Sequence, residues 1–239
     1  EAADMILMDD NFASIVRAVE EGRTIYNNIR KVVCYLLSCN IGEILVIFFP
    51  MLLGMPVPLT PIHLLAINLI TDAFPAFALG MEEKEKGIMD APPRDPKTPI
   101  IDKKMRVAVA IQSLSLALGV LGAFVFSLLR FRDEQTAKTV CFFTLVVGEL
   151  LRAYTARSET TSIFAMKKFS NKYLNQCVIA SIVFLLCSVY LPYLNTVFGN
   201  APLHPFALLC AVVFAFIPML GGEISKILIK TEKRKGVSV

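Results

Sequence analysis

The sequence predicts an all-α membrane protein: a polytopic bundle of six transmembrane helices with a short soluble N-terminal remnant. Of its 239 residues 55% are hydrophobic and 18% charged, and the mean hydropathy is +0.61. Soluble domains have about 45–50% apolar and about 25% charged residues. A spanning helix needs about 20 consecutive apolar residues. Six nearly charge-free segments meet or approach that length: 32–53, 59–80, 107–129, 139–156, 173–197 and 203–222.

The charge distribution predicts the orientation of these spans. The net charge of +4 is too small to indicate nucleic-acid binding. Basic residues gather in the loops 81–105 and 157–172 and in the segment from Lys226 onward, whereas the connections 54–58 and 198–201 have none. The short connection between the third and fourth spans is an exception, with three basic residues. The positive-inside rule therefore places both termini in the cytoplasm.

The first 31 residues are not membrane-like. The apolar run 5–8 ends in Asp-Asp-Asn, a pattern typical of a strand followed by a turn. From about residue 14, apolar residues recur at helical spacing, and no helix breaker separates this stretch from the first span. We therefore expect a charged helix that continues directly into the membrane.

Three acidic residues lie inside the apolar segments: Glu43, Asp72 and Glu149. A charged side chain near the bilayer centre costs several kcal/mol or more, and such residues usually mark an ion or proton pathway. Polar residues in spans can also serve only to join helices. Glu149 has a potential partner in Arg152, three residues on, whereas Glu43 and Asp72 have no basic residue in their own spans.

Oxygen-bearing neighbours accompany two of these acids. Asn40 precedes Glu43 by three residues, and Asn68 precedes Asp72 by four, with Thr71 beside it. Residues at these spacings project from the same helix face. Convergent carboxylate and amide oxygens suit a hard cation such as Ca²⁺, which takes about 6–8 oxygen ligands.

Other residues refine this hypothesis. Pro75 follows Asp72 by three residues, so we expect the second span to loosen around 68–72 and to expose carbonyl oxygens. The six cysteines lie scattered in apolar segments without a C-x-x-C pair. They are interpreted as small buried hydrophobic residues, and a soft-metal site is not indicated.

These residues carry a family resemblance. Segment 1–31 resembles the end of the phosphorylation domain of P-type ATPases and its stalk. The motif S-C-N-I-G-E at 38–43 is similar to the fifth membrane helix of sarcoplasmic-reticulum-type calcium pumps, and N-L-I-T-D-A-F-P-A at 68–76 to the sixth. Segment 89–100 resembles the connector that follows. The resemblance is specific to about residue 100 and weaker to about residue 229.

The resemblance implies a domain organisation. Residues 1–24 would end the cytoplasmic phosphorylation domain and stalk, 25–232 would form the transmembrane domain (family helices five to ten), and 233–239 would be a cytoplasmic tail. It also implies that Asn40, Glu43, Thr71, Asp72 and Glu149 form one calcium site. Asn68 and Asp72 would contribute to a second site, whose remaining ligands come from a fourth family helix outside this chain.

Two positions bear on the ion. Asn68 stands where sodium/potassium pumps of the family would have Asp, which favours calcium. Arg152 departs from the family pattern. We expect it to extend to water at the near membrane surface, because a long arginine stem can reach the interface from one turn inside. Glu149 would then remain available, and two calcium ions per cycle would follow.

The implied function is the membrane part of an ATP-driven pump that moves Ca²⁺ out of the cytoplasm, with proton counter-transport. Motifs D-K-T-G-T, T-G-E-S and T-G-D-G-x-N-D do not occur here, so we expect no ATP hydrolysis by this chain alone. Mg²⁺ and ATP would act only in the intact parent. The partners would be the lipid bilayer and an N-terminal part with four helices and the cytoplasmic domains. The membrane would be the plasma membrane in a bacterium.

Alternatives remain open at this point. The chain could belong to a P-type pump for Na⁺, K⁺ or Mn²⁺. It could be a secondary cation transporter or channel, which the soluble start disfavours. A purely structural bundle is disfavoured by three intramembrane acids.

Overall fold

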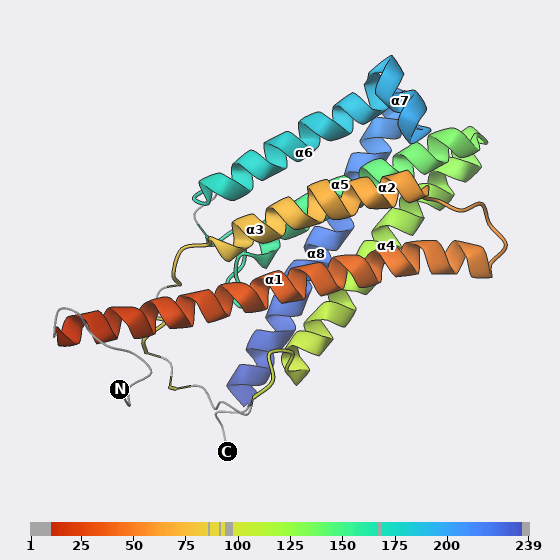
Figure 1. Ribbon diagram of the computed structural model, residues 1–239. Coiled ribbons are helices and arrows are strands. Elements are labelled where there is room, and N and C mark those ends of the chain that lie inside the picture. Colours follow the sequence, from red (N-terminus) through yellow and green to blue (C-terminus); the bar gives the residue numbers. More distant parts are fainter. Residues whose placement is uncertain (1–10, 86, 91, 94–97, 167–168, 236–239) are drawn as a thin grey trace.

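The computed structural model describes residues 11–85, 87–90, 92–93, 98–166 and 169–235, and every regular element in these ranges is helical. The long helices run alongside one another in one bundle (Figure 1). Six helical segments in the described ranges are long and apolar enough to cross a membrane, which confirms the predicted number of spans. The elements are α1 (Phe12–Leu52), α2 (Pro61–Ala66), η1 (Ile67–Ala73), α3 (Phe74–Gly80), α4 (Lys103–Phe131), α5 (Glu134–Ala156), α6 (Lys172–Tyr190), α7 (Pro192–Phe198) and α8 (Pro205–Lys235).

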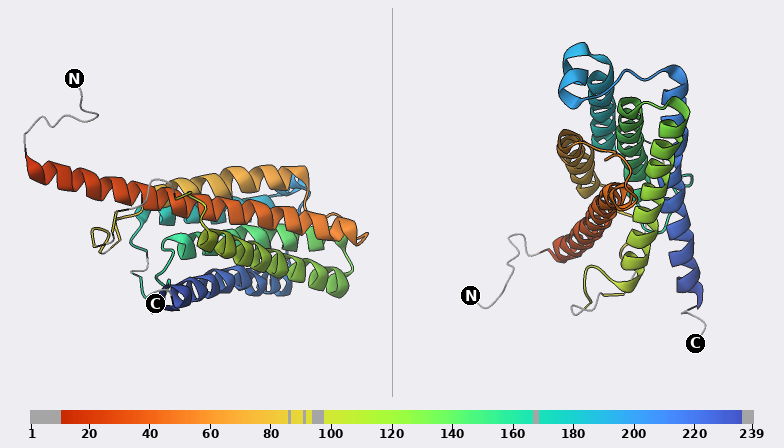
Figure 2. Two further views of the ribbon diagram at one scale, coloured as in Figure 1. Left: turned by 90° about the horizontal axis from the view of Figure 1, so that it is seen from below. Right: turned by 90° about the vertical axis from the view of Figure 1, so that its right-hand side faces the viewer.

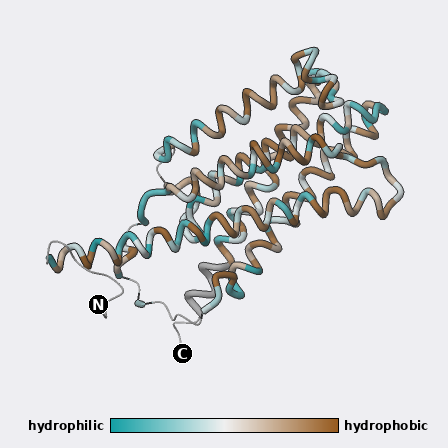
Figure 3. The backbone as a smooth tube through the Cα atoms, in the orientation of Figure 1, coloured by the Kyte–Doolittle hydropathy of each residue, from teal (hydrophilic) through white to brown (hydrophobic). Residues whose placement is uncertain are grey.

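Helix α1 contains 41 residues and runs without a break from the stalk into the first span. Asn11 caps its start, because its side-chain oxygen accepts the backbone N–H of Ala13 at 3.0 Å. The first part of α1 projects beyond the other helices (Figure 2), and hydrophobic residues dominate the helices within the bundle (Figure 3). The expected continuity is therefore confirmed. The proposed boundary at residue 24 falls inside this helix, and the predicted strand at 5–8 lies outside the described residues.

The second span is interrupted by a π-helical segment, η1, between α2 and α3. Pro75 has no N–H and so cannot bond to a carbonyl in the preceding turn. The carbonyl of Thr71 instead accepts the hydroxyl of Tyr35 on α1 at 2.9 Å, and the carbonyl of Ile70 accepts the hydroxyl of Ser181 on α6 at 3.1 Å. The predicted loosening around 68–72 is confirmed. The expectation that it exposes carbonyl oxygens does not hold for Ile70 and Thr71, because side chains from two other helices bond to their carbonyls.

Helix α5 lies at the centre of the bundle. It has the lowest mean hydropathy of the six spans, 1.3, yet 78% of its most apolar window is buried. It packs against α1, α4 and α8. Glycines allow close approach at two interfaces with α8. A Cβ on Gly148 of α5 would lie 3.1 Å from Pro218 of α8, and one on Gly119 of α4 would lie 3.0 Å from the carbonyl of Phe214 of α8. Close packing through small residues is typical of membrane helices, and it lets a polar helix occupy the interior.

The fifth and sixth predicted spans differ from the observed helices. The segment 173–197 is not one helix, because α6 ends at Tyr190 and α7 begins at Pro192. Leu191 is extended (ψ 124°), as is usual for a residue before proline. Helix α8 continues to Lys235, well beyond the predicted end of its span at 222, so the predicted tail from 233 begins inside a helix.

At one end of the bundle, the connections between spans are fastened to α1. Arg30 forms ion pairs with Asp102 at 3.0 Å and with Glu159 at 3.2 Å. Lys31, only 2% exposed, forms an ion pair with Glu85 at 2.9 Å. These contacts connect the N-terminal half of α1 to the segments that precede α4 and follow α5.

A buried polar cluster lies nearby around Glu82. Arg157 donates from Nη2 to Glu82 at 2.6 Å and from Nε to both of its oxygens at 3.0 and 3.1 Å. Asn171 adds a hydrogen bond to Glu82 at 2.7 Å and a second to the carbonyl of Ala78. The Glu82 and Arg157 side chains are 9% and 5% exposed. This ion pair therefore joins the end of α3 to the segment between α5 and α6.

We expect Glu82→Ala to lower the free energy of unfolding of the full-length protein by about 3–5 kcal/mol, because it removes the carboxylate that compensates the buried charge of Arg157. Glu82→Leu combined with Arg157→Met should recover most of this loss. The matched control is Lys84→Ala, which breaks the exposed ion pair with Glu20 and should cost less than about 1 kcal/mol. Denaturant titration in detergent measures all three. A Glu82→Ala loss no larger than that of the control would contradict the prediction.

Candidate functional site

The three intramembrane acids come together in the bundle interior. Glu43 on α1 is 5% exposed, Asp72 on η1 is 2% exposed, and Glu149 on α5 is fully buried. Each lies within the electrostatic reach of at least one of the others. One oxygen of each carboxylate, Oε1 of Glu43, Oδ1 of Asp72 and Oε1 of Glu149, has no hydrogen-bond partner. Buried acceptors without partners are costly, and a positively charged occupant would remove this cost.

The second oxygen of each acid accepts a hydrogen bond from a side chain that the sequence also indicated. All six predicted site residues therefore belong to one connected cluster. The bonds are Asn68 Nδ2 to Glu43 Oε2 at 3.2 Å, Asn40 Nδ2 to Asp72 Oδ2 at 3.5 Å, and Thr71 Oγ1 to Glu149 Oε2 at 2.9 Å.

The two asparagines lie on an exposed flank of the cluster. Their amide nitrogens also donate along their own helices, to the carbonyl of Leu36 at 2.8 Å and to that of Leu64 at 3.0 Å. In this arrangement Asn40 and Asn68 present N–H groups to the acids. To bind a cation, each amide has to turn its oxygen inward, a rotation of the terminal amide that needs no backbone movement.

Tyr35 is a component that the sequence analysis missed. It is fully buried on α1, and its hydroxyl donates to the carbonyl of Thr71 at 2.9 Å and, more weakly, to that of Glu149 at 3.4 Å. It therefore joins the three elements that carry the acids. A tyrosine within an apolar span needs a partner for its hydroxyl. This need is the sequence signal that could have drawn attention to Tyr35.

Cys39 also adjoins the acids. Its Sγ and one oxygen each of Asp72 and Glu149 all lie within 4.8 Å of one another. The sequence analysis interpreted Cys39 as a small buried residue, which agrees with its complete burial. It did not predict that Cys39 lies beside the acids. Carboxylate oxygens outnumber the single sulfur here, so the donor set fits a hard cation such as Ca²⁺ better than a soft metal.

Arg152 contradicts the expectation that it extends to water. Its side chain is 1% exposed, and Nη2 donates to Ser38 Oγ at 2.7 Å and to Gln112 Oε1 at 2.8 Å. Among the described residues it forms no ion pair with Glu149. Polar partners on α1 and α4 hold the guanidinium inside the bundle, so it does not need to reach the interface. Glu149 therefore has no ion pair with Arg152, as predicted, but for a different reason.

Six membrane-length helices with an oxygen-rich acidic cluster at their centre define an integral, multi-pass membrane protein suited to cation transport. Residues 56–228 match the family described as "Cation transporting ATPase, C-terminus". This match covers most of the chain, which belongs to that family.

Curated relatives agree with this assignment. The chain is 39% identical over 94% of its length to a protein named "Calcium-transporting ATPase" from Bacillus subtilis, and 37% identical over 95% of its length to "Calcium-transporting ATPase 1" from Bacillus cereus. It is 36% identical over 87% of its length to human "Calcium-transporting ATPase type 2C member 1". The aligned regions cover 25%, 27% and 23% of these proteins, so the chain spans about a quarter of their length.

Proposed function

We propose that this chain is the ion-translocating membrane part of an ATP-driven P-type pump that moves Ca²⁺ out of the cytoplasm. The observation that carries the proposal is the convergence of Glu43, Asp72 and Glu149, each buried and each with an unpartnered oxygen, from three different spans. The family membership and the names of the relatives support calcium as the transported ion.

The proposed ligands are Asn40, Glu43, Asn68, Thr71, Asp72 and Glu149. Because Asn40 and Asn68 lie on an exposed flank, further oxygen ligands can approach from that side. We infer that the N-terminal part of the same pump, with its first four helices, packs there. This part would also supply the cytoplasmic domains that bind Mg²⁺ and ATP.

The stalk of α1 provides a path from phosphorylation to the ion site. Helix α1 is continuous from Phe12 to Glu43 and beyond, and ion pairs from Arg30 and Lys31 fasten it to the neighbouring connections. A movement of a domain attached before α1 would therefore displace Glu43 relative to Asp72. The basic connections 81–105 and 157–172 favour a cytoplasmic location for the end of the bundle where they lie and for both termini. The surrounding medium would be the lipid bilayer. In a bacterium the membrane would be the plasma membrane.

Two other functions have less support. A P-type pump for Na⁺, K⁺ or Mn²⁺ is compatible with the acids, but the relatives are named as calcium-transporting ATPases. A secondary transporter is disfavoured by membership of a family of cation-transporting ATPases.

We expect Asp72→Asn in the full-length pump to lower the apparent calcium affinity at least about a hundredfold, because a buried carboxylate contributes several kcal/mol to binding a divalent cation. Calcium-dependent ATPase activity and ATP-driven calcium uptake into sealed vesicles measure the effect. The control is Asp133→Asn, at the exposed cap of α5, where Asn also caps well. Near-normal calcium dependence of Asp72→Asn would refute a central ligand role.

We also expect proton counter-transport. After calcium leaves, three close carboxylates in a low-dielectric interior carry an excess of negative charge, which favours proton uptake. The internal pH of sealed vesicles, followed during calcium uptake with a membrane-impermeant dye, should rise as protons leave. Calcium uptake without opposing proton movement would refute this expectation.

A further inference from the structure

Arg152 carries a buried positive charge within the bundle. It is the largest of the fully buried side chains in the described residues and lies one helical turn beyond Glu149 on α5. Isolated burial of a guanidinium costs several kcal/mol, and such a residue is retained when nearby charge or hydrogen bonds compensate it. The compensating groups therefore indicate what Arg152 does.

Neutral groups hold the guanidinium in place. Its Nη2 donates to Ser38 on α1 and to Gln112 on α4, and Gln112 in turn donates to Ser225 on α8 at 2.9 Å. Its Cζ lies 5.9 Å from the centroid of the Tyr35 ring, within the range of a cation–π contact. Four helices thus fix the position of this charge, but none of these partners neutralises it.

The compensating negative charge belongs to the acidic cluster. Arg152 interacts electrostatically with Asp72 and Glu149, without a direct ion pair to either in the described part of the chain. The Tyr35 ring lies beside the guanidinium, and its hydroxyl bonds to the carbonyls of Thr71 and Glu149. Arg152 is therefore held near the acids without occupying their oxygens.

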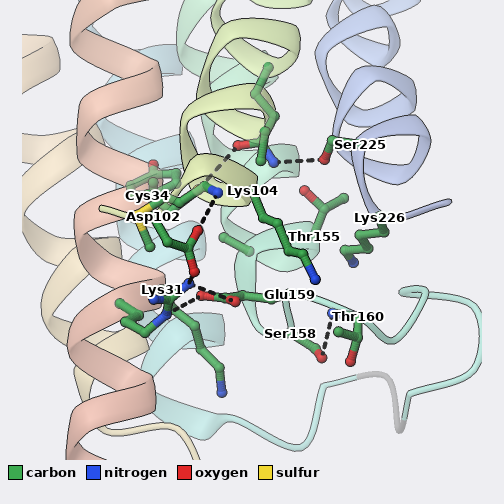
Figure 4. Close-up of a pocket in the computed structure, with 16 residues that line it drawn as sticks. Lys31, Cys34, Asp102, Lys104, Thr155, Ser158, Glu159, Thr160, Ser225 and Lys226 are labelled. Carbon is green, nitrogen blue, oxygen red and sulfur yellow. Dashed lines mark hydrogen bonds and ion pairs between the residues drawn. The ribbon is translucent and has the colours of Figure 1, made fainter. Parts of the chain in front are cut away.

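Within the described residues, no acidic side chain forms an ion pair with Arg152. Two neighbours of Arg152, Gln112 and Tyr35, line a cavity of about 240 Å³. Figure 4 shows the basic side chains of Lys31, Lys104 and Lys226 around this cavity. The charged residues around it are Arg30, Lys31, Lys104, Lys226, Asp102 and Glu159. Both of these acids already pair with Arg30. Four basic side chains and only two acidic ones line the cavity, so its charge does not favour the entry of calcium.

We propose that Arg152 is a resident cation of the ion site, which neutralises one of its three carboxylate charges and leaves a charge balanced by one calcium ion. The inference rests on the proposed function. Three carboxylates and one guanidinium sum to a charge of −2, which a single Ca²⁺ neutralises. It replaces the expectation of two ions per cycle, which depended on Arg152 extending to water.

Equilibrium binding of radioactive calcium to the purified full-length pump, expressed per phosphorylatable site, tests the proposal. The wild type should bind one ion. Arg152→Gln should bind the first ion at least about tenfold more tightly, because a fixed positive charge near a divalent cation has been removed. Arg152→Lys keeps the charge and should stay within a few-fold of the wild type. The control Arg132→Gln removes an exposed basic residue after α4 and should leave binding unchanged.

The outcomes separate this inference from the proposed function. Two ions bound by the wild type would overturn the inference while leaving the calcium pump in place, and this result needs no variant to fold. Weaker or unchanged calcium binding by a folded Arg152→Gln would show a structural role for Arg152 and overturn the inference as well. No calcium binding by a wild-type pump that is still phosphorylated by ATP would refute the proposed function and the inference together.

Discussion

The hydrogen bond from the Tyr35 hydroxyl to the carbonyl of Thr71 is the contact on which the centre of this bundle depends. Pro75 cannot supply the backbone donor that an uninterrupted helix would provide, and a bilayer interior offers no water to replace it. Tyr35 supplies that donor from α1, so the π-helical segment stays open without leaving the carbonyl unpaired. The same hydroxyl reaches the carbonyl of Glu149 at 3.4 Å. One side chain thereby sets the mutual positions of the helices that carry the three acids.

This arrangement places opposite charges close together while keeping them unpaired. The carboxylates take hydrogen bonds from Asn40, Asn68 and Thr71, and Arg152 takes its partners from Ser38 and Gln112. A direct Glu149–Arg152 ion pair would close the site by satisfying both groups. Because each is satisfied in part by neutral groups, the acids keep free oxygens and the field of the arginine still acts on them. The buried charges therefore set the ionic character of the site more than the stability of the fold.

Much of the fold and of the candidate site could be predicted from the sequence, and the features that could not be predicted have physical reasons. Apolar length alone identified six spans, and Pro75 together with Asp72 identified the loosened segment. The i,i+3 and i,i+4 spacings predicted which polar residues share a helix face, and these residues lie in one cluster. Contacts between helices have no such signature, so the partners of Tyr35, Cys39 and Arg152 could not be assigned. Proline at 192 was a visible warning that the span 173–197 is divided, but total hydrophobicity obscured it.

The most direct test of the account is to locate the bound ion in the intact pump by crystallography, with anomalous scattering from calcium. We expect a calcium peak whose oxygen ligands include Glu43, Asp72 and Glu149 at about 2.3–2.6 Å. Arg152 should remain buried and should not contact the ion. A calcium ion bound elsewhere in the membrane region, with these three carboxylates turned away from it or paired with Arg152, would contradict the account.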